Sequence, residues 1–149
     1  MTNPTTIALA PTAALTAPRR LFWITPLTIL TSAVANLALY AAAGRLVPAV
    51  TAWPGAGPAQ IVGSTAVYLL IGALIFALLC RFSAQPARRY QRIAIIGLLL
   101  SLALPIGAGF GYGAPGAPPA GPATVLTLSL MHVIAFAISV PMFIRLTRV

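Results

Sequence analysis

The sequence predicts an all-α membrane protein, an up-down bundle of four transmembrane helices with its N- and C-termini in the cytoplasm. Of the 149 residues, 60% are hydrophobic and only 6% are charged, and the mean hydropathy is +0.99. This composition lies far outside that of a soluble domain. Four stretches without a charged side chain approach the length that crosses a bilayer, and arginines flank them.

The first span is predicted at 21–43, after Arg19 and Arg20. Residues 1–18 are rich in Thr, Ala and Pro without charge or periodicity, so we expect a disordered tail before a four-helix domain at 19–149. The sequence Arg19-Arg20-Leu21-Phe22 also resembles a twin-arginine export signal. The uncharged run exceeds the roughly 7 to 15 residues of a signal's hydrophobic region, which favours a first span.

The second and third spans are predicted at 59–80 and 93–112. A segment rich in Pro and Gly, 47–58, suits the turn before the second span, and a short connection with four arginines precedes the third. The most apolar part of the third span reaches only about 21 Å at 1.5 Å per residue, so the residues up to 112 are needed to complete the crossing. Pro105 is expected to kink this helix.

The fourth span is predicted at 123–144, after a loop of Gly, Pro and Ala. Gly57-Pro58-Ala59 before the second span recurs as Gly121-Pro122-Ala123 before the fourth, and Tyr68 and His132 fall at matching places. Two similar hairpins related by an axis along the membrane normal would explain this repetition. Chance resemblance is the alternative, because Gly, Pro and Ala are common throughout the chain.

The arginines predict the orientation of the bundle. Short cytoplasmic loops carry an excess of positive charge, and the predicted spans place eight arginines on one side and Arg45 alone on the other. The chain has no acidic side chain to balance them, so we expect anionic lipid headgroups to do so. The predicted headgroup contacts are Arg19, Arg20, Arg81, Arg88, Arg89, Arg92, Arg145 and Arg148.

The absence of Asp, Glu and Lys excludes most catalytic chemistry. Paired-acid hydrolysis, a Ser/His/Asp triad and metal sites with carboxylate ligands all need an acidic side chain. Cys80 is the single cysteine, so it can form neither an intrachain disulfide nor a metal site alone. Haem ligation by His132 would need a second axial ligand, for which Met131 is a poor candidate. We therefore predict no enzyme, no cofactor and no metal, and no binding to nucleic acid, because the arginines lie at the ends of apolar runs.

Each predicted span carries one seam of small or polar residues, which is typical of helices that pack in lipid. Asn36, Tyr68 and His132 lie at depths that agree within about 5 Å, so we predict that they meet in a buried polar layer. Ser101 of the third span completes this candidate layer. An ionisable residue inside a membrane points to a proton relay or a ligand contact. The alternative is a neutral, packed histidine that hydrogen bonds to Tyr68 or Asn36.

Three short motifs stand out: Arg-Arg-Leu-Phe-Trp at 19–23, Arg81-Phe82 with Pro86-Ala87-Arg88, and Leu130-Met131-His132-Val133 before Pro141. Together they resemble an uncharacterised bacterial family of small four-span membrane proteins, a domain of unknown function. The resemblance covers about Arg19 to Leu146, and it implies a topology without an activity, substrate or cofactor. We expect the bundle to lie in a bacterial inner (cytoplasmic) membrane.

The sequence therefore leaves two functions open. The first is a structural or accessory membrane protein that packs as a homo-oligomer or against another membrane subunit. The alternative is a small transporter or ligand-binding bundle that uses the polar layer around His132. A ligand-sized cavity at His132 would favour the second function, because a purely structural bundle has no use for one.

Overall fold

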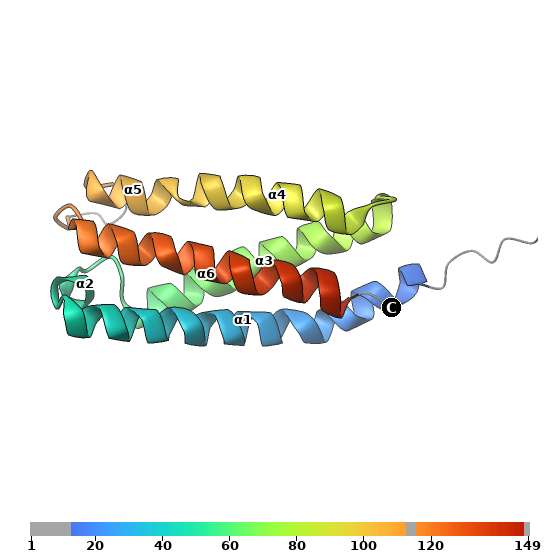
Figure 1. Cartoon of the computed structure of the whole chain (residues 1–149), viewed down its shortest axis with the longest axis horizontal. Coiled ribbons are helices and arrows are strands. Elements are labelled where there is room, and N and C mark those ends of the chain that lie inside the picture. The colour runs from blue at the N-terminus through green and yellow to red at the C-terminus, as the bar shows by residue number, and fades with distance from the viewer. Residues whose placement is uncertain (1–12, 113–115, 148–149) are drawn as a thin grey trace, which may run out of the picture.

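The computed structural model describes residues 13–112 and 116–147, with side chains from Arg20 onward. This part of the chain contains helices and no strand, which confirms the predicted all-α class (Figure 1). The helices are α1 (Ala13–Leu46), α2 (Ala49–Ala52), α3 (Pro58–Phe82), α4 (Pro86–Ser101), α5 (Ala103–Gly109) and α6 (Pro122–Leu146).

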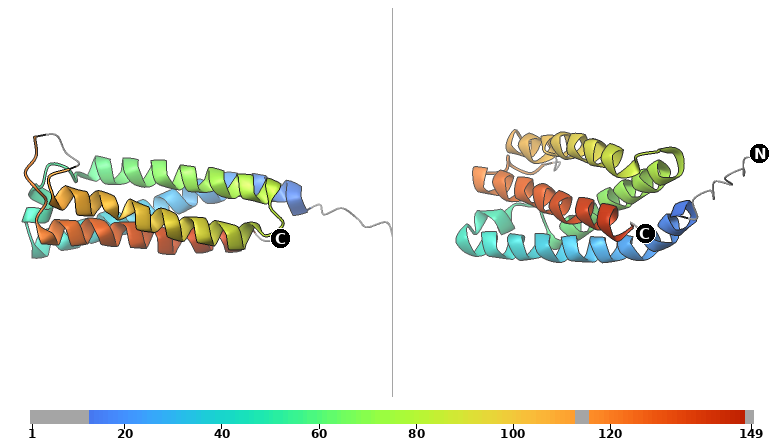
Figure 2. Two further views of the ribbon diagram at one scale, coloured as in Figure 1. Left: turned by 90° about the horizontal axis from the view of Figure 1, so that it is seen from above. Right: turned by 45° about the vertical axis from the view of Figure 1, so that its right-hand side comes forward.

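Four helical segments are long and apolar enough to cross a membrane, as predicted. Consecutive segments run in opposite directions, so the described parts of the chain begin and end at the same end of the bundle (Figure 2). The helix ends place Arg20, Arg81 and Arg145 at that end, with the arginines of α4, and Arg45 at the other. Arg148 lies outside the described residues. The segments are Arg20–Leu46, Pro58–Phe82, Pro86–Gly109 and Pro122–Leu146.

Two predicted boundaries are wrong. Helix α1 begins at Ala13, so residues 13–18 are helical rather than part of a disordered tail, as the helix-favouring Ala and Leu residues there explain; residues 1–12 lie outside the described part. The third span begins at Pro86 instead of 93, because proline fits the first turn of a helix, where its missing N–H leaves no bond unmade. The predicted basic connection is therefore mostly the first turns of α4.

Pro105 interrupts the third span, which the structure divides into α4 and α5. A proline has no N–H for the carbonyl four residues earlier, here that of Ser101, and its ring clashes with that carbonyl. The helical ladder continues on both sides, with Leu102 N donating to the Leu98 carbonyl and Ile106 N donating to the Leu102 carbonyl. The interruption at Leu102 thus lies one turn before the proline that causes it.

Helix α1 is the centre of the packing, and it contacts both α3 and α6. Its buried face is small and polar and includes Thr28, Ser32, Ala33 and Asn36. Small residues let helices approach closely in lipid, where no hydrophobic force drives their association. Across the described residues, α4 and α5 contact α3 or α6 but do not reach α1.

An aromatic cluster holds α4 to the rest of the bundle at the arginine-bearing end. The Tyr90 ring lies 4.9 Å from that of Phe76 on α3 and 6.0 Å from that of Phe143 on α6, both edge to face. Phe76 and Phe143 stack at 6.3 Å. Gly72 permits this approach, because a Cβ there would lie 3.1 Å from the Tyr90 hydroxyl. The position of α4 therefore depends on one cluster near one end.

We predict that Phe143→Ala destabilises the bundle by about 3 to 5 kcal/mol, because Phe143 is completely buried and truncation leaves a cavity. Phe110→Ala is the matched control, since Phe110 is 76% exposed, and it should change the free energy of unfolding by less than about 0.5 kcal/mol. Unfolding by sodium dodecyl sulphate in mixed micelles measures both values. Equal effects of the two substitutions would contradict this packing scheme.

Candidate functional site

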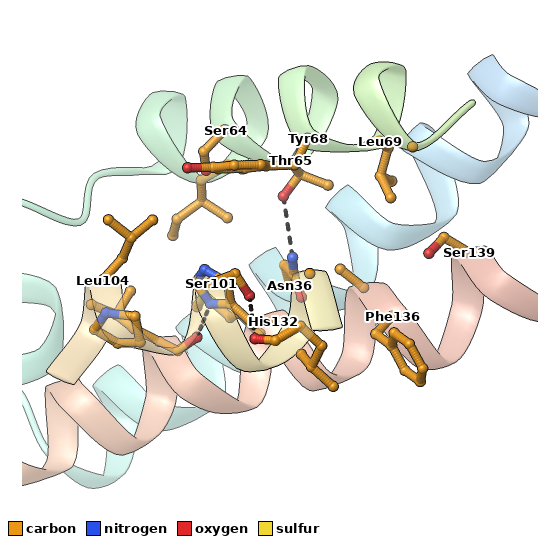
Figure 3. Close-up of a pocket in the computed structure, with 18 of the residues that line it drawn as sticks. Asn36, Ser64, Thr65, Tyr68, Leu69, Ser101, Leu104, His132, Phe136 and Ser139 are labelled. Carbon is orange, nitrogen blue, oxygen red and sulfur yellow. Dashed lines mark hydrogen bonds between the residues drawn. The ribbon is translucent and has the colours of Figure 1, made fainter. Parts of the chain in front are cut away.

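A cavity of about 660 Å³ lies between α3, α4, α5 and α6, and α1 contributes Asn36 to its lining (Figure 3). It exists because the third span is held by aromatic contacts near the arginine-bearing end, while towards the loops α5 contacts α6 and leaves α3. Tyr90 lines the cavity near the cluster. At the loop end, the Trp53 Nε1–H donates to the Pro118 carbonyl at 2.9 Å and joins the two loops beside the cavity.

All four residues of the predicted polar layer line this cavity. Asn36 comes from α1, Tyr68 from α3, Ser101 from α4 and His132 from α6. The layer is not buried as a whole, however, because the gap between α3 and α5 exposes it. Asn36 is 3% exposed and Tyr68 is 50% exposed, while Ser101 and His132 are intermediate. The expectation of a fully buried layer is therefore wrong, and a functional role for these residues stays a prediction.

His132 is hydrogen bonded within its own helix. Its Nδ1 lies 2.7 Å from the carbonyl oxygen of Leu128, one turn earlier. A carbonyl only accepts, so Nδ1 carries a proton, and in the neutral ring Nε2 is then an acceptor. Nothing in the described part of the chain hydrogen bonds to Nε2, so the expected bonds to Tyr68 or Asn36 are absent there. Nε2 is thus available to a ligand.

Asn36 makes the interhelical hydrogen bond of the site. Its Nδ2 donates to Thr65 Oγ1 on α3 at 3.2 Å, whereas its Oδ1 is buried and has no partner in the described structure. An unsatisfied buried acceptor costs about 1 to 3 kcal/mol, which is tolerated at few positions. Oδ1 is therefore a buried acceptor of the site without a partner.

Several hydroxyl groups complete the polar lining. Two serine hydroxyls donate to carbonyls of their own helices, Ser101 to that of Leu98 and Ser64 to that of Ile61. The hydroxyls of four further lining residues make no hydrogen bond to any described residue: Tyr68, Tyr90, Tyr112 and Ser139. These hydroxyls can donate or accept, so they can adapt to a bound molecule.

Thr65 and Tyr90 are the important residues that sequence reasoning left out of the layer. Thr65 lies beside Ser64 on α3, and only the rotation of the helix decides which of the two meets Asn36. Tyr90 precedes the predicted third span at 93–112 and was therefore not considered for the layer. With the helix started at Pro86, Tyr90 would have been its fifth residue and a candidate for packing inside the bundle.

The site is neutral and mostly apolar. No arginine lines the cavity, and the chain contains no carboxylate. No three potential metal ligands come together within residues 13–112 and 116–147. The arrangement can bind an uncharged molecule that buries apolar surface and forms a few hydrogen bonds, the usual combination in small-molecule sites.

We predict that Asn36 and Thr65 are energetically coupled by about 0.6 kcal/mol and at most about 1.7 kcal/mol, the range measured for such pairs in membrane proteins. A double-mutant cycle with Asn36→Ala and Thr65→Ala measures this coupling. The matched control pairs Asn36→Ala with Thr127→Ala, because Thr127 bonds only to the Ala123 carbonyl of its own helix. A coupling no larger than in the control would show that the hydrogen bond contributes nothing.

The comparisons with known proteins agree with the fold. Residues 16–149 match the model of a family of unknown function, DUF6069, and the chain therefore belongs to this family. This confirms the resemblance to an uncharacterised family of four-span proteins. No curated protein and no solved structure gives a significant match.

Proposed function

We propose that this member of the DUF6069 family binds a lipid-soluble small molecule in the cavity beside His132. The observation that carries the proposal is a cavity of about 660 Å³ that reaches the available Nε2 of a histidine in the middle of a span. Cavities of about 300 to 1,000 Å³ hold typical small ligands. A bundle with only a packing role gains nothing from such a space, because empty volume forfeits van der Waals contacts.

The ligand enters from the bilayer. As far as the chain is described, no Cα atom of α3 lies within 8 Å of one of α5. Tyr68 on α3 and Leu104 on α5 lie on either side of the resulting opening, and both are about half exposed (Figure 3). In a membrane this side of the bundle faces hydrocarbon, so molecules dissolved in the bilayer reach the cavity without crossing an aqueous phase. Transport across the membrane would require a second opening.

The surrounding membrane is a bacterial inner membrane in this proposal, with the arginine-bearing end in the cytoplasm. The concentration of arginine at one end of the bundle supports this orientation, because the excess of positive charge marks the cytoplasmic side. Anionic lipid headgroups are the partners we propose for these arginines.

An accessory role is the second candidate, and the sparse packing of the third span favours it. Only 11% of the residues in its most apolar window are buried, against 28% or more in the other three spans. A helix of another subunit, or of a second copy of this chain, could lie between α3 and α5 and fill the cavity.

We predict that Gly97→Leu abolishes ligand binding, because Gly97 lines the cavity and an added Cβ meets nothing within 4 Å. The larger side chain should fill the cavity without strain. Gly63→Leu is the matched control, since the space around Gly63 is equally open and Gly63 does not line the cavity. Mass spectrometry of molecules that copurify in lipid nanodiscs measures the bound ligand.

The expected result is a copurified small molecule in the wild type and in Gly63→Leu, reduced at least tenfold in Gly97→Leu. A wild-type protein without such a molecule, or equal retention by both variants, would contradict ligand binding. A copurified protein that Gly97→Leu loses and Gly63→Leu keeps would instead establish the accessory role.

A further inference from the structure

We propose that the cavity selects a neutral, lipid-soluble molecule that donates hydrogen bonds, such as an alcohol or a phenol, over analogues that can only accept them. The inference rests on the proposed function and adds the chemical class of the ligand. Its basis is that the two atoms of the layer without a hydrogen-bond partner, His132 Nε2 and Asn36 Oδ1, are both acceptors.

The polarity of His132 follows from its helix. The Leu128 carbonyl can accept the Nδ1 proton and can do nothing else, so the 2.7 Å contact fixes the tautomer. A charged ring at this depth would be costly in a membrane, and the chain has no carboxylate to pair with it. The neutral ring therefore presents Nε2 to the cavity as an acceptor.

The polarity of Asn36 follows from Thr65. One of the two side-chain N–H groups of Asn36 is used in the interhelical bond at 3.2 Å, and Oδ1 is the atom left without a partner. This side chain is 97% buried and lines the cavity, so the orphaned oxygen is a property of the site rather than of the surface.

The rest of the lining decides that the ligand is neutral and lipophilic. Between the polar groups the walls consist of aliphatic and aromatic side chains, among them Leu69, Ile75, Met131 and Phe136. No charged side chain of the described residues faces the cavity, so a carboxylate, phosphate or ammonium group would enter without a counter-charge. The adaptable hydroxyls of Tyr68 and Ser139 neither favour nor oppose a donor.

The unused acceptors should discriminate strongly between two ligands that differ only in having or lacking a hydrogen-bond donor. When a site is built to hydrogen bond one polar group, an analogue without that group leaves buried atoms unpaired and binds more weakly. A methyl ether is such an analogue of an alcohol, because it keeps the oxygen and adds only one methyl group, but has no proton to donate. We expect an alcohol to bind about tenfold more tightly than its methyl ether.

The test uses 1-pyrenebutanol and its methyl ether with the full-length protein in lipid nanodiscs. Trp53 lines the cavity, and energy transfer from tryptophan to pyrene reports binding. A Trp23→Phe background leaves Trp53 as the only donor, and Trp23 is 72% exposed, so the substitution should leave the fold intact. Only the saturable part of the signal counts, because both probes also dissolve in the lipid.

In this background the alcohol should bind about tenfold more tightly than the ether. His132→Phe keeps a ring and removes the acceptor, so it should lower the preference at least threefold. Ser129→Ala should leave the preference unchanged, since Ser129 bonds to the Val125 carbonyl of its own helix and does not line the cavity. The preference of the background protein tests the inference by itself, even if His132→Phe does not fold.

Equal affinities for the two probes, or tighter binding of the ether, would overturn donor selection and leave the proposed function standing. No saturable binding of either probe would overturn both. A preference that survives His132→Phe unchanged would also refute the assignment, because His132 would then take no part in the selection.

Discussion

The attachment of the third span by the ring of Tyr90 is the interaction on which the rest of the structure depends. Tyr90 packs against Phe76 and Phe143 and fixes α4 near the arginine-bearing end. Beyond the interruption caused by Pro105, α5 follows α6 and leaves α3. The cavity is the space that this arrangement leaves, so the same contacts that stabilise the bundle also determine where a ligand can bind.

Because the spans are suited to lipid rather than water, a few polar groups are enough to indicate where a ligand binds. In hydrocarbon each polar group must find a partner within the protein, and most hydroxyls of the spans do so with a carbonyl one turn earlier. Thr25, Thr28 and Thr127 all follow this rule. Against that background the unused acceptors of His132 and Asn36 are exceptions, as is the buried hydroxyl of Ser32, which does not line the cavity. His132 and Asn36 both line the cavity.

The sequence predicted what depends on composition and could not predict what depends on helix rotation. Uncharged runs and flanking arginines were sufficient for four spans, and the depth of Asn36 and His132 was sufficient to place both on one site. The start of the third span was missed because arginines were taken to end the helix, although Pro86 begins it. The cavity was beyond prediction, because it follows from the contact of Tyr90 with two distant helices.

Nitrogen NMR of the single histidine is the most direct test of the central claim, that the cavity presents an available acceptor. Since His132 is the only histidine, ¹⁵N labelling of histidine gives one imidazole spectrum without assignment ambiguity. The account predicts a protonated Nδ1 and an unprotonated Nε2 for protein in lipid, with the Nε2 resonance shifting when an alcohol is added. A protonated Nε2, in the other tautomer or in a charged ring, would contradict it.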